Sequence, residues 1–319
     1  ISNKKTIIFL LFLGSLILIL SLLIHSGKIS SIKPDLPKKI QKTFKMEDDK
    51  NCWDIDYAHT KNKKKWFCEI GAKVKNASFV IIGDSHALAL KPGFDIAGKE
   101  LGKKGIFIGY SLCPALLGVH SIRDDRNIRS CIKLNDKTFN YLVENKIKKI
   151  FLISRWSHYT TGSYDKNNFS HISLDEKFFS NKENSRAAFL YGLKNTIKKY
   201  NNQDIKVYFI HQVPQQVYLP NYAYTKSLTK DQKNINEELL NNYGVKYKKH
   251  MNLQKFVRDK VKKSSDLNPD FEVIDLNKFF CDKKSCKIGT KNNSFYNDKN
   301  HLSIYGASLL KNNIKNYLD

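Results

Sequence analysis

Ser85, Asp298 and His301 are the residues of this chain whose types and spacing point to covalent chemistry. Ser85 follows the apolar run Val80–Gly83, an order typical of a buried strand that turns sharply into a helix. At the carboxyl end of a parallel strand and at a helix N-terminus, backbone N–H groups can hold a developing oxyanion. Taken alone, the serine fits an ordinary helix cap equally well.

The partners of Ser85 are expected near the C-terminus. Asp298 and His301 stand three residues apart in a loop before the final helical pattern, for which Ser303 is a natural N-cap. A serine hydroxyl needs a base, histidine supplies one near neutral pH, and a carboxylate orients the imidazole. The pair alone fits a surface aspartate and a capping histidine, but with Ser85 it predicts a Ser-His-Asp triad.

Alternating strand and helix patterns must position these residues. Five short apolar segments are expected as strands, at residues 77–83, 106–110, 149–154, 205–211 and 271–276. Helical patterns cover residues 87–99, 137–145 and 186–200, the segment after Ser303, and a region around 230–262. This alternation predicts a parallel sheet with helices on both faces.

The N-terminal segment is strongly apolar. Residues 6–24 contain no charge over 19 positions, about the length that crosses the hydrocarbon of a bilayer. A signal peptide is the alternative, but its apolar core is shorter and ends in a small-x-small cleavage site, which 23–27 lacks. We expect a transmembrane helix in 1–26, a linker in 27–50 and a folded domain in 51–319. Because the first residue is Ile1, we also expect more chain upstream.

The six cysteines indicate an oxidising compartment. Their proximity along the chain predicts three disulfides, Cys52–Cys68, Cys113–Cys131 and Cys281–Cys286, out of the 15 connectivities that six cysteines allow. A zinc site is the alternative, but no C-x-x-C or Cys/His cluster has ligand spacing, so no metal is expected. The bulk of the chain is therefore expected outside the cytoplasm.

The formal net charge of +25 raises the question of nucleic-acid binding. Nucleic-acid binding would need a basic face with interleaved aromatic residues or a known module, and the lysines are instead spread along the whole chain. We therefore expect a solvated basic surface and no nucleic-acid partner. Such a surface can still attract acidic glycans or anionic lipid headgroups.

Several motifs together resemble the SGNH/GDSL hydrolase superfamily, over about residues 51–319. The resemblance is closer to the SGNH domains fused to membrane acyltransferases of the acyltransferase-3 type. It rests on Gly83-Asp84-Ser85-His86-Ala87, Cys113-Pro114, Arg155-Trp156 and the stretch Tyr296 to Ser303, which reads Tyr-x-Asp-x-x-His-Leu-Ser.

The resemblance implies a three-layer α/β/α, flavodoxin-like fold with Ser85, Asp298 and His301 as the triad. It also implies transfer of an acyl group, usually acetyl, to a hydroxyl of a cell-envelope glycan through an acyl-serine. The domain itself would need no cofactor. A membrane acyltransferase domain in cis, upstream of Ile1, would supply the donor, derived from acetyl-CoA. The expected location is the periplasmic side of the inner membrane.

The oxyanion hole departs from the superfamily pattern. The place of its usual Gly-x-Asn-Asp sequence holds Ser154-Arg155-Trp156-Ser157, with no asparagine. The amide of Ser85 is one expected donor, and Gly109 fits the glycine that the superfamily carries after its second strand. Arg155 or Trp156 would donate an N–H in place of the missing asparagine, and packing at the sheet edge is the alternative for both.

Two matters stay open at this level. His86 either lines the pocket or hydrogen-bonds the local turn, and we favour the structural role because His301 already fills the role of base. An anchored extracytoplasmic esterase or deacetylase of the same fold is the main alternative function, because an acyl-serine can pass to sugar or to water. A catalytically silent glycan-binding module is disfavoured by the complete Ser-Asp-His set.

Overall fold

The computed structural model describes residues 2–25, 35–48, 53–54, 66–122, 125–164, 169–175 and 181–319. A six-stranded sheet forms the centre of the fold, with the strand order β1-β3-β2-β5-β7-β9. Its strands are β1 (Cys68–Gly71), β2 (Ala77–Gly83), β3 (Lys104–Gly109), β5 (Lys149–Ile153), β7 (Lys206–Ile210) and β9 (Phe271–Ile274). The five strands expected from the sequence are all present and pair in parallel.

Strand β1 was not predicted, and it pairs antiparallel with the edge strand β3. It reads Cys-Glu-Ile-Gly, in which only Ile70 is fully buried, so it carries no apolar run. Pairing with β3 rather than its own pattern makes this segment a strand, as is common at sheet edges. The sheet is therefore mixed and larger than the expected five parallel strands.

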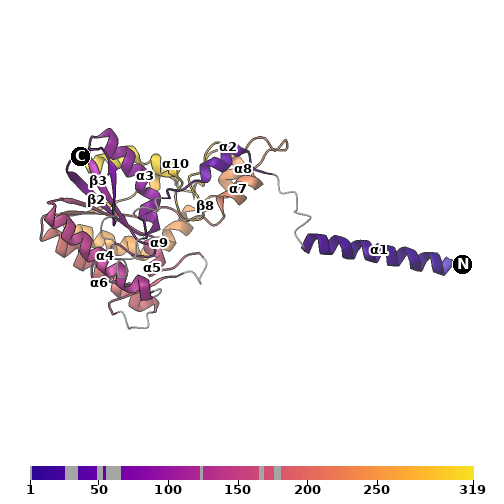
Figure 1. The fold of residues 1–319 in the computed structure, drawn as a ribbon, viewed down its shortest axis with the longest axis horizontal. Helices are drawn as coiled ribbons and strands as arrows, with labels where there is room; N and C mark the ends of the chain where they lie inside the picture. The colour runs from indigo at the N-terminus through magenta and orange to yellow at the C-terminus, as the bar shows by residue number, and fades with distance from the viewer. Residues whose placement is uncertain are drawn as a thin grey trace.

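Helices cover both faces of the sheet, as predicted (Figure 1). One face packs against α3 (Ser85–Glu100), α10 (Ile304–Ser308) and α11 (Lys311–Leu318). The other packs against α4 (Asp125–Glu144), α6 (Lys182–Asn201) and α9 (Tyr247–Asp266). Alternate residues of each strand supply the two cores, for example Ile81 to the first and Val80 to the second.

The two long excursions from the sheet contain short elements. The first holds α5 (Trp156–Thr160) and β6 (His171–Ser173), which pairs with β4 (His120–Ile122). The second holds α7 (Pro220–Lys226), α8 (Glu237–Asn242) and β8 (Val245–Lys246), which pairs with β10 (Ser285–Cys286). The helix expected around 230–262 is thus two helices, interrupted at β8. A short helix, η3 (Asn277–Phe279), follows β9.

The N-terminal region differs from its expectation in two ways. Residues Ser2–His25 form helix α1, but no helix within the described residues is both long and apolar enough to cross a membrane. The expected linker is also not a free tether where it is described. It carries α2 (Lys38–Gln41) and η1 (Lys42–Phe44), and it buries Leu36 and Ile40 against the domain.

Candidate active site

Ser85 is the first residue of α3, and Asp84 alone separates it from the carboxyl end of β2 at Gly83. Gly83 lets the neighbouring strand come close, because a Cβ at this position would lie 1.6 Å from the carbonyl oxygen of Ile153 in β5. Ser85 itself stays partly exposed at the end of the sheet. This is the strand–turn–helix placement that the sequence predicts for the nucleophile.

Asp84 fixes the turn that carries Ser85. Its buried carboxylate caps α3 by accepting the backbone N–H of His86 at 2.9 Å. The other oxygen accepts the N–H of Arg155 at 2.9 Å and the hydroxyl of Tyr159 at 2.8 Å. Burial raises the pKa of Asp84, against the lowering effect of these hydrogen bonds. Asp84 therefore ties β2 to α5, a role that the sequence motif alone does not reveal.

Asp298 and His301 meet Ser85 in the geometry of a triad. The Nε2 atom of His301 lies 2.7 Å from Ser85 Oγ, and its Nδ1 atom lies 2.7 Å from Asp298 Oδ2. The second oxygen of Asp298 accepts the backbone N–H groups of Asn300 and His301, both at 2.8 Å. The structure therefore brings together residues that are more than two hundred positions apart in the sequence.

The electrostatics of Asp298 fit the role of an orienting carboxylate. Burial alone would raise its pKa, but the hydrogen bond with His301, that residue's charge and the two backbone N–H groups hold the pKa of Asp298 well below its usual range. An ionised Asp298 accepts a hydrogen bond from the Nδ1–H group of His301. That tautomer leaves Nε2 free to take the proton of the Ser85 hydroxyl.

His86 lies beside the triad rather than in it. Its Nε2 atom is 3.0 Å from Asn300 Oδ1, and its ring centroid is 5.1 Å from that of His301. Burial, together with the nearby charges of His301 and Arg155, lowers the pKa of His86 well below its usual value. A neutral His86 donates to Asn300 and so connects the start of α3 to the Asp298–His301 loop.

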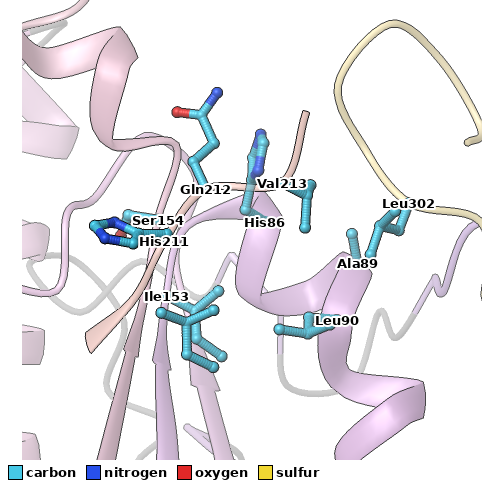
Figure 2. A pocket seen from close by; sticks show the side chains of 10 residues that line it. His86, Ala89, Leu90, Ile153, Ser154, His211, Gln212, Val213 and Leu302 are labelled. Atoms are coloured by element: carbon cyan, nitrogen blue, oxygen red, sulfur yellow. The ribbon is translucent and has the colours of Figure 1, made fainter. Parts of the chain in front are cut away.

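A narrow, mostly apolar pocket lies next to the triad (Figure 2). It is lined by His86, Ala89, Leu90, Ile153, Ser154, Ile210, His211, Gln212, Val213 and Leu302. Two of these, His86 and Leu302, are the chain neighbours of Ser85 and His301. Figure 2 shows Leu302 and Ser154 on opposite sides of the pocket, which extends from α3 toward the ends of β5 and β7.

The structure separates the two candidates for the missing oxyanion donor. Trp156 is buried, stacks on Phe209 with ring centroids 4.3 Å apart, and donates its indole N–H to the carbonyl of Ile210 at 2.8 Å. Its single side-chain donor is thus used in the core, and the prediction that the indole serves the oxyanion is wrong.

Arg155 remains near the site. One guanidinium nitrogen donates to Gln215 at 3.0 Å, while the Nε atom is buried without a partner. Burial lowers the pKa of Arg155, and the charges of Asp84 and Asp298 oppose that shift.

Gly109 ends β3 beside Gly83, but it has a packing role. A Cβ on Gly109 would lie 2.7 Å from the rings of both Phe107 and Trp53. The carbonyl of Gly109 also accepts the N–H of Asp54 at 3.3 Å. A part for Gly109 or for the Ser85 amide in an oxyanion hole stays a prediction.

Two of the three expected disulfides are present. Cys113–Cys131 joins the loop after β3 to α4, and Cys281–Cys286 closes the turn that ends in β10. The third expected pair involves Cys52, which lies outside the described residues. Within the described part of the chain, no group of three or more His, Cys, Asp or Glu side chains could hold a metal ion.

The N-terminal segment packs against the loop that carries Asp298 and His301, a contact that was not predicted from the sequence. The carbonyl of Phe44 accepts the side-chain amide of Asn297 at 2.5 Å, and the carbonyl of Lys45 accepts the N–H of Ile304 at 2.8 Å. Residues 35–48 therefore brace both ends of the segment that holds Asp298 and His301. No local pattern reveals this contact, because it joins the two ends of the chain.

Of three solved structures that are similar to this chain, the first, with a TM-score above 0.5, supports the fold. The periplasmic domain of a lipopolysaccharide acetyltransferase from Salmonella ser. Paratyphi A matches with a TM-score of 0.57 and 20% identity, over 84% of this chain and 91% of that chain. A putative acylhydrolase from Bacteroides fragilis matches with a TM-score of 0.37 and 10% identity, over 78% and 89% of the two chains. An acetyl xylan esterase has a TM-score of 0.40 and 12% identity, over 76% and 100%.

At the level of sequence, none of the curated proteins matches this chain. A family model does match, over residues 52–316, and it describes an SGNH domain fused to AT3 domains. This range includes Ser85, Asp298 and His301. The chain therefore belongs to the family of SGNH domains that are fused to AT3 domains.

Proposed function

We propose that this domain is an O-acyltransferase that moves an acyl group, most simply acetyl, to a hydroxyl of a cell-envelope glycan. The observation that carries the proposal is the pair of hydrogen bonds that connects Ser85 Oγ through His301 to Asp298, each 2.7 Å long. The periplasmic domain from Salmonella belongs to a lipopolysaccharide acetyltransferase, which supports the same type of reaction here.

The first half-reaction loads the serine. His301 Nε2 removes the proton of the Ser85 hydroxyl while Oγ attacks the carbonyl carbon of the acyl donor. The tetrahedral intermediate collapses to acyl-Ser85, and His301 returns the proton to the leaving group. The ionised Asp298 stabilises the imidazolium that forms between these steps.

The second half-reaction unloads the serine onto the acceptor. His301 removes the proton of a sugar hydroxyl, whose oxygen attacks the acyl carbon, and the proton then returns to Ser85 Oγ. The narrow apolar pocket lined by His86, Leu90 and Leu302 fits the methyl end of a small acyl group better than a long chain.

Membership of the family supports the proposed donor and location. An SGNH domain fused to an AT3 domain has a membrane acyltransferase domain in cis, which would deliver an acyl group derived from acetyl-CoA. The SGNH domain would then act on the periplasmic side of the inner membrane, where disulfides such as Cys113–Cys131 persist. The exposed apolar side chains of α1, among them Phe9, Leu11 and Phe12, would contact lipid or the membrane domain.

The test compares cells that express the full protein with cells that express Ser85→Ala. Mass spectrometry of their envelope glycans measures O-acyl groups per repeat, and we expect the O-acyl groups to disappear in Ser85→Ala cells. A matched control is Ser78→Ala, which removes an exposed hydroxyl at the opposite end of β2. Unchanged glycan acylation in Ser85→Ala cells would contradict the proposal.

A second candidate is an esterase or deacetylase of the same fold. It is favoured by the exposure of the site, because 20% of the His301 side chain is open to solvent and water can reach an acyl-Ser85. The same experiment separates the two functions by the sign of the change. A deacetylase leaves more O-acyl groups on the glycans of Ser85→Ala cells, whereas a transferase leaves fewer.

A further inference from the structure

Three tyrosines, Tyr218, Tyr222 and Tyr243, form an aromatic cluster on the excursion that follows β7. The rings of Tyr218 and Tyr222 are nearly parallel, with centroids 5.7 Å apart and an angle of 18°. Tyr243 meets both rings edge-on, at 5.3 Å from Tyr218 and 6.0 Å from Tyr222. We call these three residues the tyrosine platform.

Two rings of the tyrosine platform are open to solvent, and the third, Tyr243, is half-buried. Tyr218 is 43% exposed and Tyr222 is 45% exposed, and Leu219 beside them is 45% exposed. The three phenolic hydroxyls make no hydrogen bond to the described residues. Contiguous exposed aromatic surface in a soluble domain marks a binding site more often than a chance arrangement.

Gln216 connects the tyrosine platform to the triad. Its backbone N–H donates to the carbonyl of Lys299 at 2.6 Å, and Lys299 directly follows Asp298 in the catalytic loop. Its side-chain oxygen accepts the N–H of Val245 at 3.0 Å.

The chain length then limits how far the platform lies from Gln216. Tyr218 comes two residues after Gln216, and Tyr243 comes two residues before Val245. At about 3.8 Å between consecutive Cα atoms, the backbone of Tyr218 lies within roughly 8 Å of Gln216. Tyr222 lies in α7, and Figure 1 shows α7 and α8 side by side at one edge of the folded domain.

We propose that the tyrosine platform binds the acceptor glycan, at sugar units next to the one that receives the acyl group. A pyranose has an apolar C–H face that packs on an aromatic ring and hydroxyl groups that pair with free phenols. Tyrosine provides this contact at low entropic cost because it has only two side-chain torsions. The inference rests on the proposed function, since it assumes that a glycan is the acceptor.

A lipid surface is the other partner that exposed tyrosines suit, because they gather at membrane interfaces. The link through Gln216 favours the glycan, since it places the tyrosine platform beside the catalytic loop, where an acceptor must lie. A membrane contact needs no such link.

The test measures binding without turnover. The full protein carrying Ser85→Ala is titrated calorimetrically with oligosaccharides of three to six sugars, prepared by mild acid hydrolysis of the producing strain's envelope polysaccharide. Adding Tyr218→Ala or Tyr222→Ala is expected to raise Kd about tenfold, which corresponds to about 1.4 kcal/mol. Tyr191→Ala is the matched control, because Tyr191 is 53% exposed on α6 and lies outside the platform.

A second measurement separates this inference from the proposed function. With Ser85 present, the tyrosine variants should hydrolyse a chromogenic acetate ester within twofold of the wild-type rate, while the KM for oligosaccharide acylation rises. Absence of any sugar acylation by the wild type, with binding still lost in the variants, would defeat the proposed function alone.

Two results would overturn the tyrosine platform itself. One is no measurable oligosaccharide binding by the protein with all three tyrosines, or a Kd that is unchanged in both alanine variants. The other is binding to vesicles of three parts phosphatidylcholine and one part phosphatidylglycerol that is lost in the variants while oligosaccharide binding persists. The second result would assign the surface to the membrane.

Discussion

His86 and Asn300 join the two halves of the active site, with Nε2 of His86 3.0 Å from Oδ1 of Asn300. His86 belongs to the first turn of α3, and Asn300 to the loop that carries Asp298 and His301. The two residues are 214 positions apart in the sequence. Their contact links the same two segments as the hydrogen bond between Ser85 and His301. His86 also lines the pocket, which is the alternative that was not favoured from the sequence, and its ring bonds this distant loop rather than the local turn.

Replacing Asn300 with alanine should therefore misalign the triad. The substitution leaves Nε2 of the buried His86 without its partner, which costs about 1–3 kcal/mol of unfolding free energy, and kcat should fall about tenfold. Urea unfolding and hydrolysis of a chromogenic acetate ester measure the two effects. Asn292→Ala, at an exposed position, is the control, and equal kcat for the two variants would refute a positioning role for Asn300.

Asp298→Asn should abolish most activity while the fold persists. An asparagine cannot stabilise the imidazolium and favours the wrong His301 tautomer, so kcat should fall about 10⁴-fold, as in serine proteases. Circular dichroism checks the fold, and ester hydrolysis measures kcat. A loss of less than tenfold would show that Asp298 is not the orienting carboxylate.

The lowered pKa of Asp298 also makes a prediction about stability. An acid whose folded pKa lies below its unfolded value stabilises the folded chain above about pH 4, and this contribution is lost as the pH falls through the folded value. Urea unfolding of the wild type and Asp298→Asn at pH 7 and pH 3 should show a smaller difference at pH 3. A difference that grows on acidification would have the wrong sign.

Substitutions of Arg155 and of Trp156 should differ in their effects on kcat. Arg155→Ala should lower kcat about 10²–10³-fold if its guanidinium supplies an oxyanion donor. Trp156→Phe keeps a ring on Phe209 but loses the hydrogen bond to Ile210, so it should lower the unfolding free energy by about 1 kcal/mol and leave kcat within a few-fold. An unchanged kcat in Arg155→Ala would leave the backbone amides as the donors.

Tyr159→Phe should weaken the anchor of the nucleophile turn. It removes a hydrogen bond to the buried carboxylate of Asp84, and bonds to charged groups contribute about 1.5–3 kcal/mol. Its loss should also raise the pKa of Asp84 further, since the Tyr159 hydroxyl lowers it. Urea unfolding measures the first effect, with Tyr191→Phe as an exposed control. A variant as stable as the wild type would show that Asp84 is held by its backbone donors alone.

Local patterns in the sequence were sufficient for the elements that carry the triad. The apolar run before Ser85, the strand segments of β5, β7 and β9, and the cap at Ser303 each reflect interactions within a few residues. The Ser303 hydroxyl does accept the N–H of Gly306 at 3.0 Å. Such short-range preferences can be read from the sequence, because burial repeats with the period of the element and a cap bonds a residue two or three positions away.

Only the tertiary structure decided which polar groups have hydrogen-bond partners in the fold and which remain available to a substrate. The sequence proposed Trp156 as an oxyanion donor, but its indole N–H satisfies the carbonyl of Ile210 in the core. It named Asp84 without a role and treated residues 27–50 as a tether, although residues 35–48 brace the catalytic loop. These outcomes depend on partners far away along the chain, because a buried donor bonds whichever acceptor the packing brings within reach.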